Sequence, residues 1–429
     1  MADPQVSLLD IVKKDKFITK SDDEVLGLFK DAFETELNHL KNASPTVESG
    51  ATRNWNGTPS QKVLGKDFHE VNRTLTSMLA IKWILAGDYD TFTSGQDNGK
   101  LEEGSFKKLR EFFRHGLPTT EDIYALIVAI AIDDIGKDKA LAQSVGIPEK
   151  NHGEVLLKAA EMGLVPALET ITDQAKKHNI IHSLRIGSKL DISQIVQGET
   201  VPHSMLALDN GQKLQDAFNI KAMVTLLDVG GAAAHSDPRG CIVMTQPIFS
   251  HYMKAVELLD EYHKMENPHW PECYDNYLAY RADILKADGF ASLSTKISEQ
   301  RALLRLLCMG RVETKEKAEQ FQSAFSNLPS STKIELVQGL SVNGIQDGNA
   351  ILPYYAPGIL SEVLRGVPEG RIVQYLEAFM QFLAGVYDGS KPEPGEPGAL
   401  EERDLAPIQG TVKGPEFKND PQILATARL

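Results

Sequence analysis

Residues 120–137, TEDIYALIVAIAIDDIGK, contain the longest nearly apolar run of the chain, followed by two carboxylates, a glycine and a lysine. The threonine and acidic residues at the start can accept hydrogen bonds from the first free backbone N–H groups and suit the helix dipole. The run from Ile123 to Ile132 has about half of the ~20 residues needed to span a bilayer. The stretch therefore predicts a buried core helix whose polar end presents Asp133, Asp134 and Lys137.

Helical patterns continue on both sides of this stretch, whereas alternating β-branched runs typical of strands are few. We therefore expect an all-α fold, a helical bundle with additional C-terminal helices. The last segment is rich in proline, glycine and charge, which predicts an extended or disordered tail. The expected parts are an N-terminal helical extension and loop (1–66), a helical core (67–265), a C-terminal helical region packed on the core (266–388) and the tail (389–429).

Composition limits the possible partners. The chain has 45 Lys and Arg against 59 Asp and Glu among 429 residues, a formal charge of −14. This balance argues against a nucleic-acid partner, because phosphate neutralisation needs a basic face. The three cysteines, Cys241, Cys273 and Cys308, have no paired spacing, so a reducing compartment is expected. With no signal-peptide or membrane-span pattern, we expect a cytoplasmic protein that acts on a small molecule, without a membrane partner. The oligomeric state is left open.

The adjacent carboxylates Asp133 and Asp134 are the sharpest chemical signal. Side by side at the end of a buried helix they repel each other, and a cation is the usual compensation. The alternative is an ordinary helix end with surface aspartates and a glycine stop. Further imidazoles and a further carboxylate at helical positions supply the mixture of donors that suits zinc, manganese or iron; they are His69, His152, His178, His182 and Asp228.

The order His, then Asp-Asp-Ile-Gly-Lys, then His, His and a final Asp followed by small residues resembles the HD superfamily of metal-dependent phosphohydrolases. The resemblance covers residues 67–240 and implies an HD-like helical core with one or two Mn, Fe or Zn ions. It departs from the family at Asp133, where the family has histidine, and this change alters the charge and reach of the site. The implied metal ligands are His69, Asp133, Asp134 and Asp228 around a first ion, with His152 and His182 (or His178) for a second.

The resemblance further implies hydrolysis of a small phosphorylated substrate by a metal-activated water. Asp134 would orient the metal or accept a proton, and Lys137 would contact the anionic group. Arg185 and Arg239 are further candidates for holding the phosphate. Two alternatives remain open: an HD-type di-iron oxygenase, and a catalytically degenerate helical binding protein.

The segment His235–Gly240 gathers His, Ser and Asp within three residues. Catalytic triads are assembled in space and not from adjacent residues. We therefore interpret this segment as a turn at the rim of the site.

Overall fold

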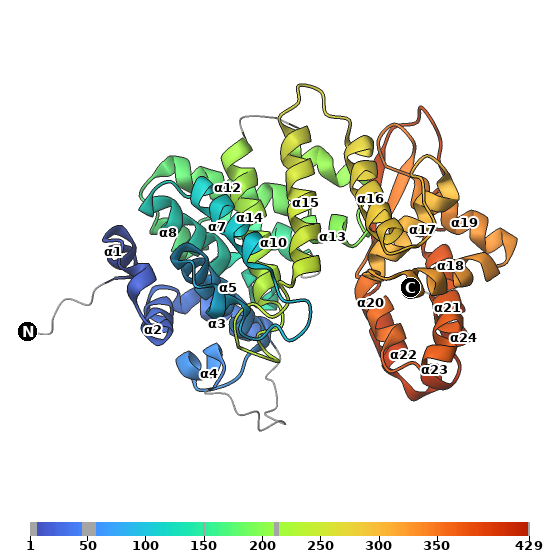
Figure 1. Cartoon of the computed structure of the whole chain (residues 1–429). Coiled ribbons are helices and arrows are strands. Elements are labelled where there is room, and N and C mark those ends of the chain that lie inside the picture. Colours follow the sequence, from blue (N-terminus) through green and yellow to red (C-terminus); the bar gives the residue numbers. More distant parts are fainter. Residues whose placement is uncertain (1–6, 45–56, 149–150, 210–213, 428–429) are drawn as a thin grey trace, which may run out of the picture. The chain divides into compact units, whose positions relative to one another are not determined.

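The computed structural model describes residues 7–44, 57–148, 151–209 and 214–427. The prediction of an all-α fold is confirmed, since helices form most of the regular structure (Figure 1). The chain divides into two compact units. Unit 1 contains residues 1–190 and 210–253, and unit 2 contains residues 191–209 and 254–429. None of the helices in the described ranges has the length and apolar character needed to cross a membrane.

Unit 1 is built around the buried apolar helix α8 (Thr120–Ile132). Thr119 and Asp122 form a capping box at the start of α8, and residues Tyr124 to Ile132 are all buried. Helix α8 packs against α5 and α14, which also pack closely against each other. The described α-helices of unit 1 are α1 (Leu8–Lys13), α2 (Asp22–Ala32), α3 (Glu34–Ala43), α4 (Pro59–Leu64), α5 (His69–Ala86), α6 (Tyr89–Thr93), α7 (Glu103–Gly116), α8 (Thr120–Ile132), α9 (Lys139–Val145), α10 (His152–Glu161), α11 (Pro166–Glu169), α12 (Gln174–Gly187) and α14 (Gln215–Gly231).

The close approach of α14 to α5 depends on Gly231. A Cβ atom at this position would lie 2.3 Å from the Ser77 hydroxyl oxygen and 2.4 Å from the Arg73 carbonyl oxygen. The Ser77 hydroxyl lies within 2.9 Å of the carbonyl oxygens of both Arg73 and Leu227, so it links the two helices. This packing brings Asp228 of α14 beside Arg73 of α5.

Unit 2 is also helical. Helix α21 packs against α18, α19 and α24, which lie around it in Figure 1. Helix α15 (Gln246–His263) has residues in both units. The other described α-helices of unit 2 are α13 (Ile192–Val196), α16 (Trp270–Ala287), α17 (Ser298–Met309), α18 (Lys315–Asn327), α19 (Ser330–Ser341), α20 (Ala356–Leu364), α21 (Ile372–Val386), α22 (Gln409–Lys413), α23 (Pro415–Asn419) and α24 (Gln422–Ala425). Short 3₁₀ turns include η2 (Ile135–Lys137) in unit 1 and η3 (Pro202–Leu208) in unit 2.

The segment from residue 389 onward differs from the extended or disordered tail that its composition predicts. Strand β2 (Ala399–Asp404) pairs in parallel with β1 (Asn349–Tyr354), with Ala399 opposite Asn349. Beyond β2, short helices bury Phe417 and Leu424. Widely spaced apolar residues therefore give this segment enough buried surface to fold, although proline, glycine and charge dominate its first ten residues.

The predicted boundaries also differ from the observed units. Most of the N-terminal extension packs into the same unit as the helical core, because α2 and α3 contact α5. Residues 191–209 were predicted to belong to the core but are part of unit 2. The hydrogen bond between Nδ1 of His203 and the Gly344 carbonyl oxygen, 2.7 Å long, is one contact within unit 2 that the sequence does not reveal.

Candidate functional site

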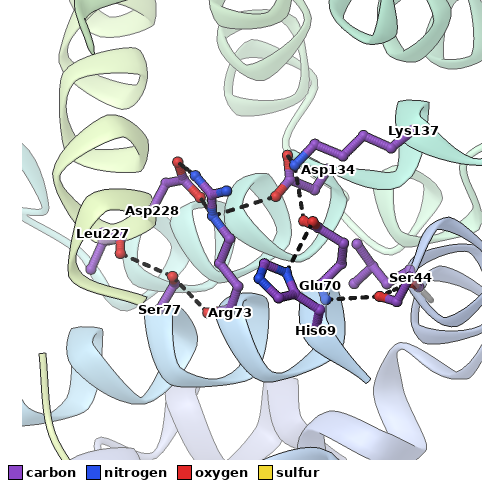
Figure 2. Close-up of polar contacts among 10 residues, drawn as sticks. Ser44, His69, Glu70, Arg73, Ser77, Asp134, Lys137, Leu227 and Asp228 are labelled. Atoms are coloured by element: carbon purple, nitrogen blue, oxygen red, sulfur yellow. Dashed lines mark hydrogen bonds and ion pairs between the residues drawn. The ribbon is translucent and has the colours of Figure 1, made fainter. Parts of the chain in front are cut away.

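Three helical segments of unit 1 bring charged side chains to one place (Figure 2). Helix α5 contributes its first turn. The backbone N–H of Glu70 in this turn donates a hydrogen bond of 2.8 Å to the Ser44 hydroxyl oxygen. The end of α8 and the following turn η2 contribute the Asp-Asp-Ile-Gly-Lys motif, and α14 contributes its last carboxylate. We call these residues the charge cluster: His69, Glu70, Arg73, Asp133, Asp134, Lys137 and Asp228.

Opposite charges alternate through the charge cluster. The guanidinium of Arg73 donates hydrogen bonds from Nε and Nη2 to the two carboxylate oxygens of Asp228. Its Nε also lies 3.7 Å from Oδ2 of Asp134. Arg73 therefore stands between two of the carboxylates that the resemblance assigns to a metal.

The alternation continues at Lys137. Its Nζ lies 2.8 Å from Oδ1 of Asp134 and 2.9 Å from Oε2 of Glu70. The other carboxylate oxygen of Glu70 lies 3.3 Å from Nδ1 of His69. The predicted substrate contact Lys137 thus already holds two carboxylates, and the network ends at a partly exposed imidazole.

The environment separates the pKa values of the two adjacent aspartates. Burial by itself raises the pKa of the Asp134 carboxyl, but the Lys137 and Arg73 cations hold that pKa well below its usual range. Burial raises the pKa of Asp133 to about 7, an effect that Lys221 opposes and Asp134 reinforces. Two neighbouring carboxyls with such different proton affinities are typical of acid–base sites, although structural ion pairs also shift pKa values.

Two further histidines lie at this site. The start of α10 packs against η2 so tightly that a Cβ on Gly136 would lie 2.1 Å from the His152 carbonyl oxygen. His152 also helps to lower the pKa of Asp134. The ring of His235 stacks on that of His69 with centroids 3.8 Å apart. His235 was not among the predicted site residues; its segment was predicted only as a turn at the rim of the site, and the signal was its position seven residues after Asp228.

The remaining predicted residues belong to other interactions. His182 lies on α12, where burial, Arg185 and His178 lower its pKa. The exposed Arg185 forms an ion pair of 2.9 Å with Glu161. Arg239 forms one of 2.7 Å with Asp237 in the predicted turn. In the described part of the chain, each of these side chains thus interacts with a residue outside the charge cluster, and their predicted roles remain predictions.

The side chains of the charge cluster do not suit the metal that the resemblance implies. Among the described residues, no group of three or more His, Cys, Asp or Glu side chains is placed to hold a metal ion. The physical reason at the charge cluster is the bidentate pairing of Arg73 with Asp228, together with the pairing of Lys137 with Asp134. In this arrangement the residues do not fit a metal ion.

Comparison with protein-family models identifies the family of the chain. A family model described as "Family of unknown function (DUF6829)" matches residues 26–424, so the chain belongs to this family. No curated protein matches the chain. No solved structure matches it either.

Proposed function

For this member of a family of unknown function, we propose that the charge cluster binds a small phosphorylated substrate and hydrolyses it by acid–base chemistry. The observation that carries the proposal is the convergence of His69 of α5, Asp134 of the turn after α8 and Asp228 of α14, in the order that the HD resemblance implies. A group of titratable side chains with strongly separated pKa values, partly open to solvent, is a candidate functional site on physical grounds.

Donor groups for an anion remain available at this cluster. Among the described residues, no hydrogen bond is found from Nη1 of Arg73, whose side chain is 23% exposed. Lys137 is 26% exposed, and its ammonium has three N–H donors, of which two carboxylates can take two. A phosphate group can therefore accept a charge-assisted hydrogen bond from either cation without breaking that cation's ion pairs.

Asp133 is the candidate base. A general base works best when its pKa lies near the working pH, and the pKa of Asp133 is raised to about 7. In the proposed step, Asp133 accepts a proton from a water molecule as the water oxygen bonds to phosphorus. The bond between phosphorus and the leaving oxygen breaks, and that oxygen takes a proton from solvent.

A second candidate function is ligand binding without turnover. It is favoured by the pairing of Glu70, Asp134 and Asp228 with Arg73 or Lys137, because a structural ion-pair network has the same arrangement. This candidate corresponds to a degenerate helical binding protein on the same scaffold.

A screen of small phosphomonoesters with the purified full-length chain tests both functions. We expect phosphate release that is lost in Asp133→Asn and retained in the matched control Asp90→Asn, which alters an exposed carboxylate. Inorganic phosphate should raise the melting temperature of the wild type but not of Lys137→Gln. Stabilisation by phosphate without turnover would select the binding function. If phosphate neither binds nor is released, both are refuted.

A further inference from the structure

We infer that the charge cluster works without a metal ion, because Arg73 supplies the positive charge that an HD-like site would take from a bound cation. The inference rests on the proposed function for the identity of the site, but it does not depend on which substrate is bound. It opposes the metal expectation that the sequence resemblance implies.

The position of the guanidinium carries the argument. Arg73 lies one helical turn after His69, so both side chains project from the same face of α5. The guanidinium forms a bidentate pair with Asp228 and also lies beside Asp134. A divalent ion bound by these two carboxylates would have to displace a fixed cation from its preferred partner.

The placement of the charges points the same way. The ion pairs of the charge cluster join three carboxylates to two cations. The carboxylates are those of Glu70, Asp134 and Asp228, and the cations are Arg73 and Lys137. Lys221 also acts electrostatically on Asp133. The acidic groups therefore have protein cations close by, and a further divalent cation would meet Arg73 and Lys137 as repelling neighbours.

The neighbouring packing keeps Arg73 in this place. Its carbonyl accepts a hydrogen bond from the Ser77 hydroxyl at 2.9 Å, and Gly231 of α14 packs directly against that carbonyl. Both ends of the Arg73–Asp228 pair are thus fixed by the contact between α5 and α14.

Metal analysis of the purified full-length chain, with thermal denaturation, tests the inference. For the wild type we expect metal well below one ion per chain and a melting temperature unchanged by EDTA or by added Mn²⁺, Fe²⁺ or Zn²⁺. Arg73→Ala removes the competing cation and should bind about one of these ions per chain and be stabilised by it. Arg73→Lys keeps a cation at this position and should remain free of metal, and Arg114→Ala, which alters an exposed arginine, is the matched control.

The double variant Arg73→Met/Asp228→Leu provides a second measurement if Arg73→Ala does not fold, because it removes both partners of the pair together. It should fold and contain no metal. Stoichiometric metal in the wild type, or a melting temperature lowered by EDTA, would overturn the inference. Phosphate release that requires added metal would refute it while preserving the proposed hydrolysis. Metal-free protein without turnover or phosphate binding would refute only the proposed function.

Discussion

Replacing Glu199 by glutamine should abolish a large part of the pH dependence of stability in unit 2. Glu199 is 5% exposed, and its carboxylate accepts a hydrogen bond from the backbone N–H of Tyr355. Tyr355 has a φ of +74° and precedes α20. Glutamine keeps an acceptor oxygen of nearly the same size but cannot ionise, so this substitution isolates the charge from the hydrogen bond.

The sign of the effect follows from the pKa. Burial raises the pKa of Glu199 from 4.5 to about 8, with Asp191 as a further cause. Glu402 also raises the pKa of Glu199, and the Tyr387 phenol interacts electrostatically with Glu199. Between these pH values the folded state holds a proton that the unfolded state has lost, so the free energy of unfolding falls as pH rises. The stability contributed by the neutral carboxyl is complete at low pH and is lost as pH approaches 8.

The size of the effect can be worked from the same shift. At about 1.4 kcal/mol per pKa unit, the wild type should lose roughly 3 kcal/mol of stability between pH 5 and pH 8 through this group. Glu199→Gln should therefore match the wild type near pH 5 and become progressively more stable than it toward pH 8. Glu369→Gln, which changes an exposed carboxylate, is the matched control.

Hydrogen exchange of the amides in α21, measured from pH 5 to pH 8 and corrected for intrinsic exchange rates, reports on unit 2 alone. This choice matters because Asp133 in unit 1 has a pKa raised in the same direction. A stability difference between Glu199→Gln and the wild type that stays constant across this pH range would refute the reasoning, because it would mean that Glu199 is already ionised at pH 5 or stays neutral at pH 8.

Three further substitutions test the packing. Arg305 is fully buried and donates hydrogen bonds to four backbone carbonyls. Arg305→Met should therefore lower the free energy of unfolding of unit 2 by about 3 kcal/mol or more in urea denaturation. A cost below about 1 kcal/mol would show that these hydrogen bonds are replaceable. Phe417→Ala should cost about 3 kcal/mol because Phe417 is buried, and an unchanged midpoint would mean that its segment does not stabilise the fold. Gly136→Ala places a methyl group 2.1 Å from the His152 carbonyl oxygen and should lower the free energy of unfolding by about 1–3 kcal/mol. Gly104→Ala meets no neighbour and serves as the control. Equal melting temperatures of these two variants would contradict the contact at Gly136.

The sequence was sufficient for the features that depend on local pattern. The apolar run with its acidic start predicts a buried helix, and α8 is that helix, closed by a capping box at Thr119. The sequence also predicts that Asp133 and Asp134 follow a buried helix, because helical periodicity and the residues that end a helix are local features of a few residues.

Composition was a poorer guide for the C-terminal segment. Proline, glycine and charge dominate residues 389–398, and this bias hides the apolar residues that follow. Phe417 and Leu424 become buried only because α21 and its neighbours offer them a surface. Burial by a partner element cannot be inferred from the average composition of a segment.

The electrostatic character of the charge cluster was decided by tertiary structure. The sequence brought forward Asp133, Asp134 and Asp228 as carboxylates in need of a cation, and it attributed that cation to a metal. Arg73 and Asp228 are 155 positions apart, and no local pattern marks Arg73 as their partner. Only the packing of α14 on α5 places a guanidinium between the carboxylates, because charges attract according to their distance in space and not along the chain.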